Sequence, residues 1–132
     1  MDIVFLDANI LFSSAYLPDS NFLKLWRFPD VRLASSDYAA QEARRNLRGA
    51  DRLEPLETLL QSVRLVGATP DLRLPEGIVL PTKDAPILLA AVAANATHLL
   101  TGDLKHFGRY RNTVVEGVLI LSASAYFLTR SL

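Results

Sequence analysis

The stretch DIVFLDANILF, residues Asp2–Phe12, decides the fold. Its first five residues, Asp2–Leu6, are apolar nearly throughout, which is typical of a parallel strand covered on both faces. Asp7 closes this run, and Asn9–Tyr16 is expected to form a helix directly after it. A strand followed by a helix is the repeating unit of α/β domains.

Four other short runs are rich in branched apolar residues and are predicted to be strands. They are Val31–Ala34 (VRLA), Val63–Val66 (VRLV), Thr97–Thr101 (THLLT) and Val118–Leu121 (VLIL). Helices are predicted over Asn9–Tyr16, Asn21–Trp26, Ser36–Leu47, Arg52–Ser62, Pro86–Ala96 and Ser122–Thr129. This alternation predicts an α/β domain with a mainly parallel sheet. We expect residues 1–132 to form a single domain of this kind.

Two of the predicted helices differ in their apolar pattern. Ser36–Leu47 carries an apolar stripe at helical spacing, whereas Pro86–Ala96 is apolar almost all round, which predicts a fully buried helix. Asp84 or Thr82 can cap the start of this second helix. The stretch Pro70–Pro81 contains three prolines and is predicted to be a surface connection.

The composition excludes several classes of protein. There is no cysteine, so disulfides and thiolate metal sites are excluded, and we expect a reducing, cytoplasmic location. The 14 basic and 14 acidic residues cancel. Binding to a nucleic acid would therefore depend on local basic patches or on metal ions. No apolar run approaches the ~18 residues of a membrane span, so no membrane association is expected.

Four acidic residues lie at positions where α/β proteins place their sites. Asp7 follows the first strand and Asp103 follows the fourth, at the carboxyl ends where open parallel sheets bind ligands. Asp84 precedes the helix Pro86–Ala96, and Glu42 borders the apolar stripe of the helix Ser36–Leu47. Each acid also has a structural explanation, because Asp7 and Asp84 can be helix caps. Only the set of four favours a function.

Converging carboxylates suit a metal-dependent hydrolysis. Mg²⁺ and Mn²⁺ prefer carboxylate oxygens, and a bound ion can generate a nucleophilic water at neutral pH. No serine, cysteine or histidine nucleophile is then required. The two histidines show neither metal-ligand spacing nor a triad. We expect His98 to be a strand residue and His106 to be solvated.

The motifs, taken in order, resemble the PIN-domain family. The matching stretches are FLDANIL (Phe5–Leu11), SSDYAAQEARRNL (Ser35–Leu47), KDAPILLAAVAANA (Lys83–Ala96) and LLTGDLKHF (Leu99–Phe107). They cover nearly the whole chain in the order of the family. The most specific feature is D-x-N after the first strand, combined with T-G-D and a nearby phenylalanine.

The resemblance implies a three-layer α/β/α fold with a mainly parallel five-stranded sheet in the order 3-2-1-4-5. It also implies metal-dependent cleavage of RNA, with Mg²⁺ or Mn²⁺ as cofactor. Carried over residue by residue, the catalytic and metal-binding acids are Asp7, Glu42, Asp84 and Asp103. Asn9 and Thr101 match polar positions that support these acids. If the alignment of the second stretch slips, Asp37 replaces Glu42.

Many compact members of the family are toxins of toxin–antitoxin pairs, so an antitoxin protein is an expected partner. A second copy of the chain is another. Large apolar residues crowd the early helices and predict an association surface, although they could equally be ordinary core. They are Phe12, Tyr16, Leu17, Phe22, Leu25 and Trp26.

Three alternatives stay open. A phosphatase similar to the haloacid-dehalogenase family also uses an aspartate after strand one, but Asn9 stands where that family has its general acid. Phe107 likewise replaces a later aspartate of that family. The second alternative is a docking domain without catalysis. The third is a nuclease that cleaves DNA instead of RNA.

Overall fold

A mainly parallel six-stranded sheet runs through the computed structural model, which describes residues 1–103 and 105–130. The strands are β1 (Asp2–Leu6), β2 (Val31–Ser36), β3 (Val63–Val66), β4 (His98–Leu100), β5 (Val114–Val115) and β6 (Val118–Leu121). Their order in the sheet is β3-β2-β1-β4-β6-β5. Leu104, in the quoted stretch Leu99–Phe107, lies outside the described residues.

The five predicted strands occupy the predicted order, with β6 as the fifth. The prediction of five strands was wrong by one, because β5 pairs with β6 as an antiparallel edge strand. Two residues between them, Glu116 and Gly117, have φ values of 51° and 82°. Positive φ at two successive positions is the signature of a tight hairpin turn. The pattern VVEGV therefore carried a hairpin signal that was overlooked.

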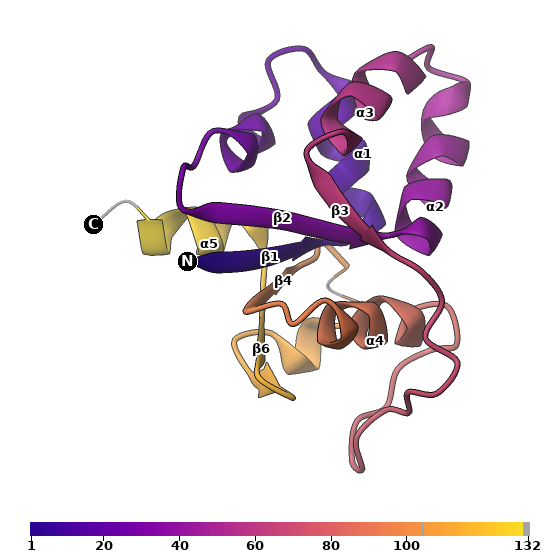
Figure 1. Cartoon of the computed structure of the whole chain (residues 1–132), viewed down its shortest axis with the longest axis vertical. Coiled ribbons are helices and arrows are strands. Elements are labelled where there is room, and N and C mark those ends of the chain that lie inside the picture. Colours follow the sequence, from indigo (N-terminus) through magenta and orange to yellow (C-terminus); the bar gives the residue numbers. More distant parts are fainter. Residues whose placement is uncertain (104, 131–132) are drawn as a thin grey trace.

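Helices cover both faces of the sheet, as Figure 1 shows, and give the predicted three layers. The α-helices are α1 (Ala8–Tyr16), α2 (Asp37–Arg48), α3 (Leu53–Leu60), α4 (Ala85–Ala93) and α5 (Ala123–Arg130). Two 3₁₀ helices are η1 (Asn21–Trp26) and η2 (Gly108–Tyr110). Helices α1, α2 and α3 lie on one side of the sheet and α4 lies on the other. None of these described helices is long and apolar enough to cross a membrane.

The core forms where β1 and β4 run side by side in the middle of the sheet. Phe5 pairs with Leu99 and Leu6 pairs with Leu100, and all four side chains are fully buried. Both strands are covered on both faces, so they carry apolar residues without alternation. Leu88 of α4 packs into the same core.

Helix α4 is less buried than its apolar sequence predicts. Ile87 and Leu88 are buried, but Leu89 and Val92 are only half-buried and Ala93 is exposed. One side of the helix therefore faces outward. The connection that precedes it, including Pro70–Pro81, contains no helix or strand and runs along the surface, as predicted.

Candidate active site

A cleft of about 480 Å³ opens where the carboxyl ends of β1 and β4 meet the start of α4. The four predicted acids all line it. Its full lining is Asp7, Asn9, Phe12, Glu42, Asn46, Lys83, Asp84, Ile87 and Asp103. The strand order explains this convergence, because β1 and β4 are neighbours that end at the same edge of the sheet.

Asp7 is buried at the base of the cleft. Its Oδ1 accepts a hydrogen bond of 2.7 Å from the backbone N–H of Ala8, so it caps α1. Burial, added to the charges of Glu42 and Asp84, outweighs this bond and raises the pKa of Asp7 to about 6. A carboxylate with a raised pKa is short of positive charge. Asp7 is therefore both a helix cap and an electrostatically uncompensated group.

Thr101 and Asn9 connect Asp7 to the loop that follows β4. The Thr101 hydroxyl donates to Asp7 Oδ2 at 2.7 Å and accepts from the backbone N–H of Asp103 at 3.0 Å. The Asn9 side chain donates to Asp7 Oδ2 at 3.3 Å and accepts from the backbone N–H of Gly102 at 2.8 Å. These bonds hold Asp7 and Asp103 in a fixed relation across two strands.

Asp84 lies at the start of α4, but its side chain makes no capping bond. Of the two predicted caps, Asp84 or Thr82, Asp84 occupies the N-cap position, but no described side chain caps the helix through a hydrogen bond. The side chain is only 9% exposed. Its Oδ2 accepts no hydrogen bond among the described residues. Burial and the nearby Asp103 charge raise the pKa of Asp84.

His106 contacts two of the acids, which corrects the expectation that it is solvated. Its Nδ1 lies 2.8 Å from Asp103 Oδ2 and 3.0 Å from Asp84 Oδ2. Its backbone N–H also donates to Asp103 Oδ1 at 3.1 Å. Burial opposes ionisation of Asp103, but these two bonds from His106 prevail and lower its pKa. The three-residue spacing within one tight turn was the overlooked signal.

Glu42, and not Asp37, is the acid of α2 that faces the cleft. Glu42 is half-buried and lines the cleft with Asn46 one turn later. Asp37 is exposed at the start of α2 and lines a different pocket, beside Gly67 and Pro70. The Glu42 side chain has no ion-pair partner among residues 1–103 and 105–130.

The donor set fits a divalent cation. Asp84, Asp103 and His106 each offer one ligand atom, and the three atoms lie within 4.8 Å of one another. Carboxylate oxygens are the ligands that Mg²⁺ and Mn²⁺ prefer. The buried Asp84 Oδ2 without a hydrogen-bond donor is the kind of atom that a cation would satisfy. Sequence reasoning missed His106 and also Lys83 and Asn46, which line the cleft.

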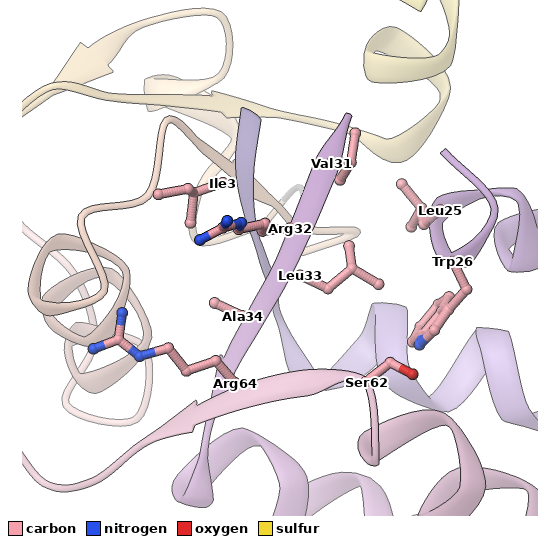
Figure 2. Close-up of a pocket in the computed structure, with 9 residues that line it drawn as sticks. All are labelled: Ile3, Leu25, Trp26, Val31, Arg32, Leu33, Ala34, Ser62 and Arg64. Carbon is pink, nitrogen blue, oxygen red and sulfur yellow. The ribbon is translucent and has the colours of Figure 1, made fainter. Parts of the chain in front are cut away.

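A second pocket, of about 410 Å³, lies at the β2 edge where β3 has not yet begun. Figure 2 shows Arg32 and Arg64 on the same side of β2, with Trp26 on the other. Its lining has no carboxylate, in contrast to the acidic cleft. This pocket therefore lacks the carboxylate oxygens that hard cations prefer.

The apolar residues of the early helices divide between core and surface. Leu25 is buried, and Phe12, Phe22 and Trp26 are partly buried. Tyr16 and Leu17 are 46% and 52% exposed at the end of α1. Most of this group is therefore part of the core, while Tyr16 and Leu17 are exposed, and the predicted association surface stays a prediction.

Two solved structures are similar to this chain. One is VapBC2 from Rickettsia felis bound to a DNA fragment from their promoter, with a TM-score of 0.63 and 19% identity. The alignment covers 91% of this chain and 98% of that chain. The other is VapBC-1 from nontypeable Haemophilus influenzae, with a TM-score of 0.56, 19% identity, and coverage of 91% and 97%. No family model and no curated protein sequence matches.

At this level of identity the likeness shows the fold. The resemblance predicted from the sequence motifs is confirmed in this sense, because the chain has a PIN-like fold. Both alignments span nearly all of the matched chains, so the likeness is not confined to one supersecondary unit.

Proposed function

We propose that this chain is a metal-dependent ribonuclease that hydrolyses phosphodiester bonds of RNA in the acidic cleft. The observation that carries the proposal is the convergence of four carboxylates from separate elements on one cleft, two of them buried. Burying aspartates near one another costs stability unless a cation compensates them. A divalent cation bound at this edge of the sheet would offset the cost of burying these acids.

Each acid has a defined part in this proposal. Asp84 and Asp103 would hold a divalent ion, Mg²⁺ or Mn²⁺, with Asp7 and Glu42 completing the negative field around it. Thr101 and Asn9 keep Asp7 and the Asp103 loop in register through their hydrogen bonds. When bound, the ion supplies positive charge to the phosphate and acidifies an attacking water.

Lys83 gives the cleft a basic group at its rim. It is exposed and lines the cleft beside Asp84. Because the chain has no net charge, attraction of a polyanion must come from such local groups and from the ion. A free 2′-hydroxyl is not needed for this chemistry, so DNA remains the competing substrate.

The phosphatase alternative is disfavoured by the contacts of Asp7. A nucleophilic aspartate needs an oxygen free to attack phosphorus. Here Oδ1 accepts from Ala8 and Oδ2 accepts from Thr101 and Asn9. Asn9, at the position of the general acid, is itself engaged with Gly102. The docking-domain alternative predicts no specific metal binding, which distinguishes it from the nuclease.

We also propose that the chain is the toxin of a toxin–antitoxin pair. The support is that both similar structures are VapBC toxin–antitoxin complexes. A groove of about 720 Å³ beside the exposed Leu17 runs along α3 and is lined by Leu53 and Leu59. An antitoxin segment or a second copy of the chain could cover it. Light scattering that shows a clean monomer, with no partner on affinity purification, would count against both.

The activity is tested with a mixed pool of labelled RNAs, incubated with Mn²⁺, with Mg²⁺ or with EDTA. The expected result is cleavage at defined sites that requires the ion and is absent in Asp84→Asn. The same pool made as DNA separates the two substrates. Release of phosphate from p-nitrophenyl phosphate without RNA cleavage would favour the phosphatase instead.

A further inference from the structure

The turn Asp103–Phe107 places a histidine among the acids that the proposed function uses. We infer that His106 Nδ1 is itself a ligand of the divalent ion, together with Asp84 and Asp103, and that the site therefore prefers Mn²⁺ or another first-row transition ion to Mg²⁺. This inference rests on the proposed function, because it concerns the same ion.

The contacts of Nδ1 are the first argument. It lies 2.8 Å from Asp103 Oδ2 and 3.0 Å from Asp84 Oδ2. Neighbouring ligand atoms of a six-coordinate ion with bonds of ~2.1 Å lie about 3 Å apart. The distances from the nitrogen to both oxygens therefore match those between neighbouring ligands of one ion.

The second argument is that the one hydrogen of the imidazole nitrogen cannot satisfy both carboxylates. A ring nitrogen carries at most one hydrogen, and that hydrogen can serve only one of the two carboxylates well. The closer partner is Asp103, which leaves Asp84 Oδ2 without a hydrogen bond among the described residues. The Asp84 side chain is 9% exposed, so water does not readily compensate it. A cation shared by all three atoms satisfies every one of them.

The backbone holds His106 in this place. Its N–H donates to Asp103 Oδ1 at 3.1 Å, and the N–H of Phe107 donates to the carbonyl of Asp103 at 3.1 Å. The Phe107 side chain is fully buried and anchors the turn in the core. The imidazole is therefore presented to the acids before any ion binds.

An imidazole changes the preference of a carboxylate site. Imidazole suits first-row transition ions, Fe, Ni, Cu and Zn most strongly and Mn²⁺ less so, whereas Mg²⁺ takes oxygen ligands almost alone. Loss of an outer partner of a metal ligand already costs ~10–100-fold in affinity. Replacement of a true ligand should cost at least as much for Mn²⁺, and less for Mg²⁺.

The test is pulsed electron paramagnetic resonance of Mn²⁺ bound to the full chain, with Mn²⁺ and Mg²⁺ titrated by calorimetry. The expected result is a nitrogen coupling that changes when histidine is labelled with ¹⁵N. In His106→Gln the coupling should vanish, and the Mn²⁺ affinity should fall by about tenfold or more. Lys105→Gln, in the same turn, is the matched control and should keep the coupling.

The labelling needs no variant, so the test stands even if His106→Gln folds poorly. The other histidine, His98 of β4, does not line the cleft, because its ring contacts Thr97 and Tyr126 of α5. Mn²⁺ binding without nitrogen coupling, or coupling that survives in His106→Gln, would overturn the inference and leave the proposed function standing. Absence of any Mn²⁺ binding to the wild type would overturn both.

Discussion

Strand β1 begins with Asp2 and is followed directly by Asp7, and these two aspartates have opposite electrostatic surroundings. Asp2, at the start, accepts a hydrogen bond of 2.7 Å from the Tyr126 hydroxyl and lies 3.5 Å from the Arg130 guanidinium. Arg130 also pairs with Asp30 and lowers its pKa. Asp7, just past the other end, is buried among acids, and its pKa rises to about 6.

We interpret the paired acids at the amino end as structural and the acids at the carboxyl end as the proposed functional group. At the amino end of the sheet, Asp2 and Asp30 share the permanently charged guanidinium of Arg130, and Asp2 also accepts a hydrogen bond from Tyr126. At the carboxyl end, the chain supplies carboxylates in excess, and His106 is shared between two of them. Acids with perturbed pKa values of this kind cluster at functional sites, which supports the proposed cation at the carboxyl end.

The largest expected effect comes from replacing either Asp2 of β1 or Asp7, which follows β1, with asparagine. Asp7→Asn should reduce metal-dependent RNA cleavage by on the order of 1000-fold, which corresponds to ~4 kcal/mol of transition-state stabilisation. Asp2→Asn should leave cleavage close to wild type, because Asp2 lies far from the cleft at the other end of the strand. Initial rates on one labelled RNA, with circular dichroism to check folding, decide this. Equal losses in both variants would remove the distinction between the two ends.

The next effect concerns stability and pH without metal. The folded pKa of Asp7 is about 6 and its ordinary value is 3.8, so the folded protein binds this proton more tightly than the unfolded chain. The stabilisation is complete below pH 3.8 and is lost as the pH rises through 6. The unfolding free energy of Asp7→Asn relative to wild type should therefore increase by about 3 kcal/mol between pH 3.5 and 7. Denaturant titrations in EDTA measure it, and a difference that does not change with pH would contradict the pKa assignment.

Thr101→Val removes a hydroxyl from the carboxyl end. The valine keeps the shape but loses the bond to Asp7 Oδ2 and the acceptor for the Asp103 N–H. Loss of a residue that orients metal ligands should lower Mn²⁺ affinity by ~10–100-fold. Calorimetric titration is the measurement. An affinity unchanged from wild type would show that the hydroxyl bridge does not position the acids.

Tyr126→Phe removes a hydroxyl from the amino end and is the counterpart of Thr101→Val. Tyr126 is fully buried, and its hydroxyl donates to Asp2. The loss of this hydrogen bond should destabilise the fold by about 1 kcal/mol. Mn²⁺ affinity should not change, since the cleft is untouched. A change in Mn²⁺ affinity without a change in unfolding free energy would contradict the claim that the amino end only stabilises the fold.

Much of the fold could be predicted from the sequence because apolar runs and turn residues are local signals. The bounds of β1, β3 and β6 were predicted to the residue. The hairpin β5–β6 was overlooked because β5 has only two residues, too few for a periodic pattern. The exposed side of α4 could not be predicted from the sequence for another reason. An apolar sequence does not reveal how much of a helix its neighbours cover.

Of the residues in the site, only the acidic ones could be predicted from the sequence. Asp7 and Asp103 follow strands, and the order of the strands then brings them together. The contact of His106 with Asp84 depends on a tertiary arrangement, because 22 positions separate the two in sequence. Glu42 and Asp37 lie on the same helix, and which of them faces the cleft depends on how that helix is rotated about its axis. Only the packing of α2 against its neighbours fixes this rotation, and it points Glu42 into the cleft.

The central claim is that the carboxyl end of the sheet is completed by a divalent cation, and thermal unfolding with and without Mn²⁺ tests it most directly. At 100 times its dissociation constant, Mn²⁺ should stabilise the wild type by ~2.7 kcal/mol at pH 7. The gain should shrink at pH 5, where protons compete for the same carboxylates. Asp7→Asn/Asp103→Asn should be at least as stable as wild type without metal and should not respond to Mn²⁺. An equal response in both proteins would show that these acids do not form the metal site.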